Sequence, residues 1–179
     1  AARDRLPEFE ALRDYGRDIR NHILDHLDLY LERYEAQVTA AGGHVHWAET
    51  AEDACTAILK ICESAGAKMV TKGKSMVSEE IGLNAHLQAA GLEVVETDLG
   101  EYILQIRDET PSHIIAPAIH LVQDQVENDF RRQHQQLPKD RRLEEPAELV
   151  DEARQILRQK FLSADVGITG ANFLIAETG

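Results

Sequence analysis

The spacing of apolar residues changes along this chain of 179 residues. Between residues 8 and 41 apolar side chains recur every three or four positions, which predicts one long helix or two helices in series that end at Gly42 and Gly43. The stripe consists of Leu12, Tyr15, Ile19, Ile23, Leu27, Tyr30, Leu31, Tyr34 and Val38. About 34 residues is long for a globular helix, so we expect part of it to project or to pack on a partner.

The middle of the chain alternates short apolar runs with helical patterns. The runs predict strands at residues 44–48, 68–70 and 92–96. Between them we predict helices at residues 51–65, with Thr50 as N-cap, and at about 78–90. Strands and helices that alternate with short connections are typical of a parallel sheet covered by helices.

The remainder of the chain is less regular. Residues 102–106 fit either a strand or a short helix, and residues 112–116 are typical of a buried strand. Pro117 suits the first position of a helix that reaches about residue 135, and Pro146 can begin another helix. A final strand is expected within residues 164–170, running into a glycine turn.

Composition limits the possible partners and the location. The chain has 19 basic and 32 acidic residues, a net charge of −13, which disfavours nucleic acid as a partner. No apolar run is long enough to span a bilayer, and the first residues lack the apolar core of a secretion signal, so we expect a cytoplasmic protein. Cys55 and Cys62 lie two turns apart on a predicted helix, which favours two buried thiols over a disulfide or a metal cluster.

Residues 71–80 form a polar turn between a predicted strand and a predicted helix, where backbone N–H groups can face an anion. The turn at residues 169–172 is expected at the same edge of the sheet. Together they predict a phosphate or carboxylate site, although a solvated loop with ordinary helix capping explains residues 71–80 equally well. The predicted ligand-binding residues are Lys72, Lys74, Ser75, Ser78, Glu79, Gly170, Asn172 and Thr178.

Other candidates for chemistry are weaker. Glu177 follows an apolar run, so we expect it at the sheet edge, where a carboxylate could act as nucleophile or base; a simple turn explains it equally well. Glu79 and Glu80 fit an acid–base pair or favourable charges in a first helical turn. His22 and His26 are four residues apart, but no spacing supplies a third ligand, so we predict no metal site.

Three separated motifs resemble the LUD-domain family. They are Lys72 to Asn84 (KGKSMVSEEIGLN), Pro111 to His120 (PSHIIAPAIH) and Ile168 to Gly179 (ITGANFLIAETG). The likeness is strongest to the iron–sulfur members of a lactate-oxidation system. It implies a three-layer α/β/α fold with a mostly parallel sheet, similar to the NagB/RpiA/CoA-transferase group, and a role with partner subunits in converting L-lactate to pyruvate.

The resemblance also implies a domain arrangement. We expect a helical extension over residues 1–43 and a LUD α/β domain over residues 44–179 that is incomplete at its C-terminal end. In the family, a ferredoxin-like region follows, whose cysteines bind two [4Fe–4S] clusters. Those cysteines do not occur in this chain, so we expect no cofactor within it.

Three functions remain open on this basis. The first is the LUD-domain portion of an iron–sulfur electron-transfer subunit in L-lactate oxidation, with a site for a small organic acid or phosphate. The second is a CoA-transferase-like enzyme in which Glu177 accepts the acyl group. The third is a scaffold that assembles a complex through its long first helix. The family supplies no catalytic residues for this domain, so the site residues above rest on physical chemistry.

Overall fold

The computed structural model describes residues 3–112 and 115–179, and these residues form two compact units. The first unit contains the described residues up to His46 together with Asn172–Gly179. The second unit contains Trp47–Ala171.

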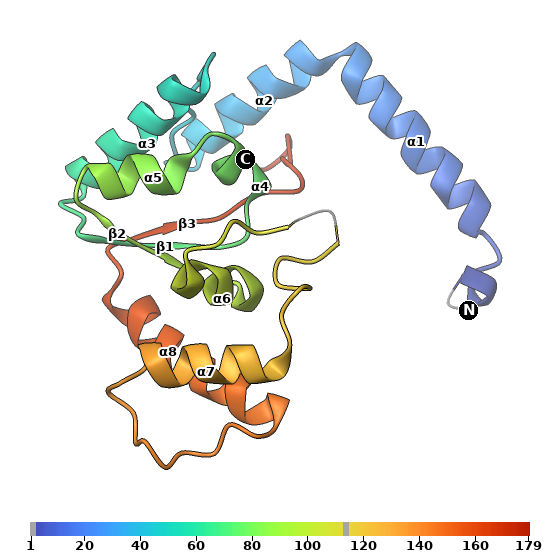
Figure 1. Cartoon of the computed structure of the whole chain (residues 1–179). Coiled ribbons are helices and arrows are strands. Elements are labelled where there is room, and N and C mark those ends of the chain that lie inside the picture. Colours follow the sequence, from blue (N-terminus) through green and yellow to red (C-terminus); the bar gives the residue numbers. More distant parts are fainter. Residues whose placement is uncertain (1–2, 113–114) are drawn as a thin grey trace. The chain divides into compact units, whose positions relative to one another are not determined.

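The first unit is built on two consecutive helices, drawn in blue in Figure 1. After a short 3-10 turn at Arg3–Arg5, α1 spans Phe9–Asp25 and α2 spans Leu27–Ala40. His26 interrupts them with φ −131° and ψ 35°, so the two-helix alternative is the observed one. None of the residues in α1 or α2 is buried in the described structure. Their apolar stripe is therefore exposed or only partly buried.

The second unit contains a parallel sheet of three strands in the order β2-β1-β3. β1 spans Met69–Lys72, β2 spans Glu93–Glu96 and β3 spans Val166–Ile168, which confirms three of the predicted strands. The strand predicted at residues 44–48 is wrong, since no regular structure is assigned there. Apolar and polar residues alternate weakly at residues 44–48, but no neighbouring strand pairs with them. A strand needs such a partner for its backbone hydrogen bonds.

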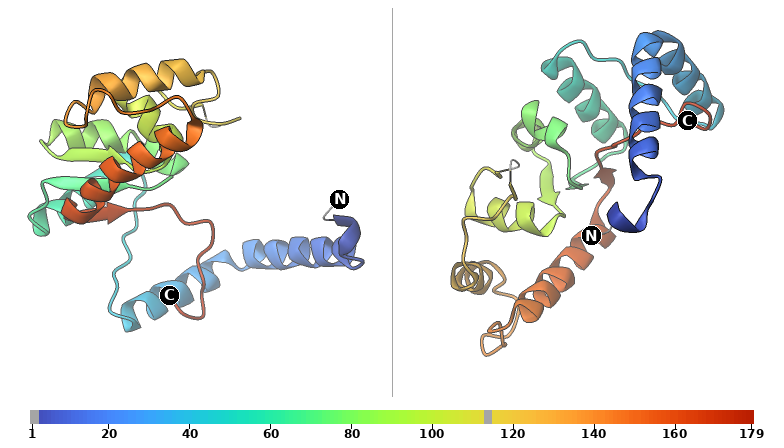
Figure 2. Two further views of the ribbon diagram at one scale, coloured as in Figure 1. Left: turned by 90° about the horizontal axis from the view of Figure 1, so that it is seen from below. Right: turned by 90° about the vertical axis from the view of Figure 1, so that its right-hand side faces the viewer.

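Five longer helices flank the sheet on its two faces (Figures 1 and 2). They are α3 (Ala51–Ser64), α5 (Leu83–Ala89), α6 (Leu99–Arg107), α7 (Gln123–Gln133) and α8 (Pro146–Ser163). Val94 packs with α3 and α5, whereas the next residue, Val95, packs with α6, α7 and α8. Successive residues of a strand point to opposite faces, so the two clusters are separate cores. The result is the predicted three-layer α/β/α fold.

Several helix boundaries differ from the predictions. The helix expected at 78–90 is two helices, α4 (Met76–Glu80) and α5, because Gly82 between them has φ +69°. Residues 102–106 are helical and belong to α6. α7 begins at Gln123 instead of Pro117, and residues 117–120 form turns.

The strand expected at residues 112–116 lies partly outside the described residues, because residues 113 and 114 are not among them. Ile115, which we expected to be buried, is 72% exposed. In contrast, the predicted burial of Cys55 and Cys62 on α3 is confirmed. None of the helices in the described parts of the chain is long and apolar enough to cross a membrane.

Candidate functional site

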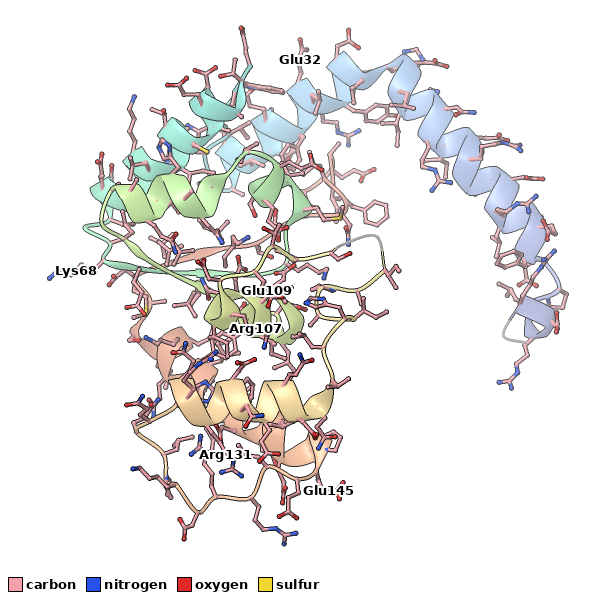
Figure 3. All side chains as sticks on the ribbon, viewed as in Figure 1. Glu32, Lys68, Arg107, Glu109, Arg131 and Glu145 are labelled. Atoms are coloured by element: carbon pink, nitrogen blue, oxygen red, sulfur yellow. The ribbon has the colours of Figure 1, made fainter. Side chains whose placement is uncertain are left out.

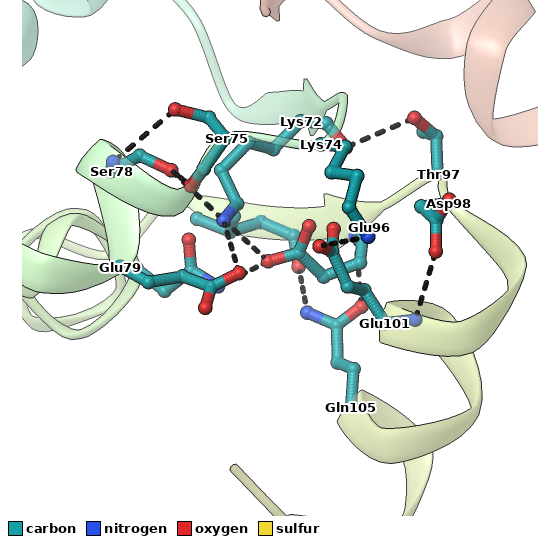
Figure 4. Close-up of polar contacts among 12 residues, drawn as sticks. Lys72, Lys74, Ser75, Ser78, Glu79, Glu96, Thr97, Asp98, Glu101 and Gln105 are labelled. Carbon is teal, nitrogen blue, oxygen red and sulfur yellow. Dashed lines mark hydrogen bonds and ion pairs between the residues drawn. The ribbon is translucent and has the colours of Figure 1, made fainter. Parts of the chain in front are cut away.

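A buried ion pair lies at the edge of the sheet where β1 and β2 end (Figure 4). Lys72 is the last residue of β1 and stands opposite Glu96, the last residue of β2. Its Nζ lies 2.8 Å from Glu96 Oε1 and 3.1 Å from Ser78 Oγ. Lys72 is 0% exposed and Glu96 5% exposed. This geometry does not fit the predicted role of Lys72 as a direct ligand for an anion from solvent.

Two amide side chains fix Glu96 in place. Asn84 Nδ2, from α5, donates to Glu96 Oε1 at 2.7 Å. Gln105, from α6, accepts the backbone N–H of Glu96 at 2.9 Å and donates to the carbonyl oxygen of Val94 at 2.7 Å. Glu96 and Gln105 are not among the site residues predicted from the sequence. The pairing of two strand ends was the available signal for Glu96, since parallel strands end at the same edge.

The two predicted serines form hydrogen bonds within the first turn of α4. Ser75 is the N-cap of α4, and its Oγ accepts the backbone N–H of Ser78 at 3.2 Å. Ser78 Oγ donates to the carbonyl oxygen of Ser75 at 2.7 Å and accepts from Lys72. Glu79 lies one residue further, with its Oε1 3.9 Å from Lys72 Nζ. Ordinary capping, the alternative explanation of this turn, is therefore observed.

A second lysine–glutamate pair lies beside the first. Lys74 is half-exposed, and its Nζ lies 3.6 Å from Oε1 of Glu101, which is only 2% exposed. Burial raises the pKa of the Glu101 carboxyl, and the charges of Glu96, Glu79 and Asp98 raise it further, while Lys74 lowers it. Glu101 thus holds a proton to higher pH than an ordinary glutamate.

These side chains border an open cavity of about 370 Å³ in the second unit. Glu79, Asn84, Glu96, Glu101 and Gln105 line it together with further residues of α5 and the segment that follows α6. Arg107, the last residue of α6, pairs with Glu109 of that segment and with Asp129 of α7. Figure 3 labels Arg107 and Glu109. The cavity lies at the carboxyl ends of the strands, where open α/β sheets bind ligands.

The polar turn at residues 71–80, called the lysine turn below, lies beside the turn after β3, as expected for two turns at the same sheet edge. Gly73 donates its backbone N–H to the carbonyl oxygen of Ile168 at 2.7 Å. A Cβ added to Gly170 would lie only 2.9 Å from the carbonyl oxygen of Lys74, so only glycine fits there without displacement. Gly170 therefore lies beside Lys74, as the prediction required.

The remaining predicted site residues belong to the first unit. Asn172 and Glu177 line a groove of about 970 Å³ together with α1 and α2. Residues 173–176 form no strand, and the expected place of Glu177 at a sheet edge stays a prediction. Thr178 is exposed and donates its backbone N–H to Ile175. A common site of these three residues with the lysine turn stays a prediction.

The described residues show no group of three or more side chains that could hold a metal ion. The rings of His22 and His26 lie 4.7 Å apart, edge to face. Cys55 and Cys62 are both buried on α3, and the sequence has no other cysteine. Because a [4Fe–4S] cluster takes four thiolates, this chain does not fit such a cluster.

A family model for the LUD domain matches residues 31–179. The chain belongs to the LUD-domain family. Among curated relatives of this LUD domain is "Lactate utilization protein B" of Bacillus velezensis, 49% identical over 179 residues, which are 99% of this chain and 37% of the relative. Proteins of the same name from Macrococcus caseolyticus and Bacillus subtilis are 51% and 48% identical over 97% and 99% of the chain.

The LUD domain described here thus spans little more than a third of the length of these relatives, 36% in each of the latter two. No solved structure matches the chain significantly. The likeness of this fold to the NagB/RpiA/CoA-transferase group therefore stays a prediction.

Proposed function

We propose that this LUD domain is part of an iron–sulfur electron-transfer subunit that takes part in the oxidation of L-lactate to pyruvate. The supporting observation is the identity of 48–51% over nearly the whole chain to relatives named for lactate utilization. Since the chain spans only 36–37% of those relatives, the activity of the whole protein requires residues outside it.

In this proposal the two [4Fe–4S] clusters are bound outside these 179 residues. The reason is the ligand count, because two buried cysteines on one helix cannot supply four thiolates to a cluster. Other subunits of a lactate-oxidising complex are the proposed partners. The LUD domain supplies the binding surfaces for these partners and for a small organic acid.

A chimera tests the lactate role. In a Bacillus subtilis strain that lacks its "Lactate utilization protein B", the matching segment of that protein is replaced by this chain, and growth on L-lactate as sole carbon source is measured. We expect growth to be restored. A control chimera carries Glu144→Gln, which changes an exposed carboxylate far from β1 in sequence. Failure to grow, with normal accumulation and normal iron content of the chimera, would contradict the proposal.

The predicted small-anion site is proposed in a narrower form, at the outer side of the lysine turn. Lys74 is half-exposed there, and the exposed Thr169 and Gly170 lie beside the turn. A lysine is a point charge that binds carboxylate or phosphate without a fixed geometry. Lys72 is left out of this narrower site because Glu96 already neutralises its charge.

Calorimetric titration of the chain with L-lactate and with inorganic phosphate tests this site. We expect Lys74→Ala to weaken binding several-fold, in line with the loss of one charge-assisted contact. Lys68→Ala is the matched control, because Lys68 is an exposed lysine immediately before β1, the strand that leads into the lysine turn (Figure 3). Equal affinities of the two variants would remove the anion site from the proposal.

A further inference from the structure

The cavity beside Glu96 presents hydrogen-bond acceptors that have no donor. Glu96 Oε2 and Asn84 Oδ1 are buried, and neither receives a hydrogen bond from the described residues. Both residues line the cavity, and Glu96 is 5% exposed. A buried acceptor without a donor is unfavourable, so such atoms are usually paired with protein, water or a ligand.

The donors next to these acceptors are already engaged. Lys72 Nζ faces Glu96 Oε1 and Ser78 Oγ, and Asn84 Nδ2 donates to Glu96 Oε1. Gln105 Nε2 donates to the carbonyl oxygen of Val94. The orientation of Asn84 follows from its bond to Glu96, which leaves its oxygen as the available atom. A ligand that completes this site must therefore bring hydrogen-bond donors.

The charge of the cavity wall selects among possible donors. Glu79, Glu96, Glu101, Asp108 and Glu109 line it, whereas no lysine, arginine or histidine of the described residues does. Lys72 and Lys74 pair with two of these carboxylates, and Arg107 pairs with Glu109. The wall is thus acidic on balance, which favours a cationic donor over a neutral one.

We propose that this cavity binds a small organic cation with N–H donors, an ammonium or a guanidinium compound, through Glu96 Oε2 and Asn84 Oδ1. A guanidinium group fits well because its N–H groups point in fixed directions and can serve two acceptors at once. The volume of about 370 Å³ is within the range of small-molecule sites. The proposal does not depend on the lactate role or on the anion contact of Lys74.

The test uses the complete 179-residue chain, with backbone amide resonances followed by NMR during titration with n-butylguanidinium. We expect saturable shifts at Asn84, Gln88 and Gln105, which lie around the cavity. Tetramethylammonium, a cation without N–H donors, and n-butanol, a neutral donor, are the ligand controls. N-acetyl-argininamide represents an arginine side chain of another protein, and its binding or exclusion decides between the two sources of the same cationic group.

Two variants locate the site. Glu96→Gln removes the negative charge from Glu96, whose Oε2 is the first acceptor. Asn84→Ala removes the second acceptor, Asn84 Oδ1, without changing any charge. Each is expected to weaken n-butylguanidinium binding by about tenfold, the effect of one charge-assisted hydrogen bond. Glu144→Gln, an exposed charge change outside the cavity, is expected to bind as the unaltered chain does.

Three outcomes would overturn the inference. The first is the absence of saturable shifts at the cavity amides with n-butylguanidinium. The second is an equal response to tetramethylammonium or n-butanol, which would mean that N–H donors or positive charge are not required. The third is unchanged binding in folded Asn84→Ala; this variant keeps the Lys72–Glu96 pair, so the test stands even if Glu96→Gln proves unstable.

Discussion

Lys72 and Glu96 place two opposite charges inside the protein, at the ends of neighbouring strands. Removing charges from water is costly, and their attraction offsets this cost only when further hydrogen bonds complete the site. Ser78 and Asn84 supply such hydrogen bonds, one to each member of the pair. Removing the charge of Lys72 or of Glu96 alone is therefore expected to lower the free energy of unfolding more than removing both charges together.

The first prediction concerns this pair. Lys72→Met is expected to lower the free energy of unfolding by about 3–5 kcal/mol, because it leaves Glu96 buried without its counter-charge. Lys72→Met combined with Glu96→Gln is expected to be more stable than Lys72→Met alone. Urea unfolding of both variants measures the difference. A double variant whose loss equals the sum of the two single losses would show that the charges do not interact.

The second prediction concerns Glu101. Its pKa in the folded protein is raised above the ordinary value of 4.5, so the folded state binds its proton more tightly than the unfolded state does. The free energy of unfolding therefore decreases as pH rises from about 4.5 through the raised pKa. Glu101→Gln cannot titrate, so its stability relative to the original chain should increase over this range. Urea unfolding at a series of pH values checks this, and a constant difference would contradict it.

At the scale of single elements, caps and buried polar networks determine where helices begin and how they pack. Thr50 Oγ1 accepts the backbone N–H of Asp53, and Asp53 accepts that of Thr50, each at 3.1 Å. On the other face of the sheet, the Tyr102 hydroxyl lies 2.8 Å from His134 Nε2, and His134 Nδ1 lies 2.7 Å from Glu152. This network ties α6 and α8 to His134, the residue that follows α7.

The third prediction addresses the cap of α3. Thr50→Ala is expected to cost about 1 kcal/mol of stability, because the backbone N–H of Asp53 loses its acceptor. Thr50→Ser is the matched control, since serine keeps the hydroxyl and should retain most of the stability. Thermal unfolding of the two variants compares them. Equal losses would assign the effect to the methyl group of Thr50 instead of its hydroxyl.

The fourth prediction concerns Tyr102. Burial, together with the charge of Glu152, raises the pKa of Tyr102 from 10.0 to about 12. The unfolded state therefore loses the proton first, and stability decreases between pH 10 and about 12. Tyr102→Phe should cost about 1–2 kcal/mol at neutral pH through the lost hydrogen bond, and this deficit should shrink in the alkaline range. Urea unfolding of both proteins at neutral and at alkaline pH measures this deficit. A deficit that is independent of pH would contradict the raised pKa of Tyr102.

At the scale of the whole molecule, the buried apolar residues are unevenly distributed. Every described apolar residue that is buried lies between Cys55 and Leu157, within the second unit. The first unit exposes large apolar side chains on α1, α2 and the C-terminal segment, among them Tyr15, Leu24 and Phe173. Helical stability in proteins comes mostly from tertiary packing, so α1 and α2 are expected to open more readily than the α/β layers.

The fifth prediction follows from this distribution. Brief digestion with trypsin should cut first after Arg13, Arg17 and Arg20, which are exposed on α1. A resistant fragment that begins at Tyr34 should accumulate, because Arg33 is the last cleavable residue before Lys60 and the second unit contains the packed core. Mass spectrometry of the fragments identifies the sites. Cleavage within α8, after Arg154 or Arg158, at the same rate would contradict the expected difference in local stability.

Much of the architecture was predictable because its signals are local. Thr50 before an amphipathic stretch, Pro146 at the start of α8 and the alternation of short strands with helices each follow from neighbouring residues. The predictions of secondary structure were wrong where local sequence signals compete with tertiary contacts. Residues 44–48 alternate as a strand does but have no partner strand, and Gly82 divides what looked like one helix.

In the candidate site, too, some features follow from the local sequence and others depend on tertiary contacts. The sequence alone determined that a turn rich in lysine and serine follows β1, and that a glycine turn follows β3 at the same edge. Only the tertiary structure decided what those lysines face. Strand pairing placed Glu96 beside Lys72, and α6 brought Glu101 to Lys74, from positions 24 and 27 residues away in the chain. Charge and hydrogen bonding depend on such distances in space, so a turn that suggests an anion site in sequence lies beside an acidic cavity in the folded protein.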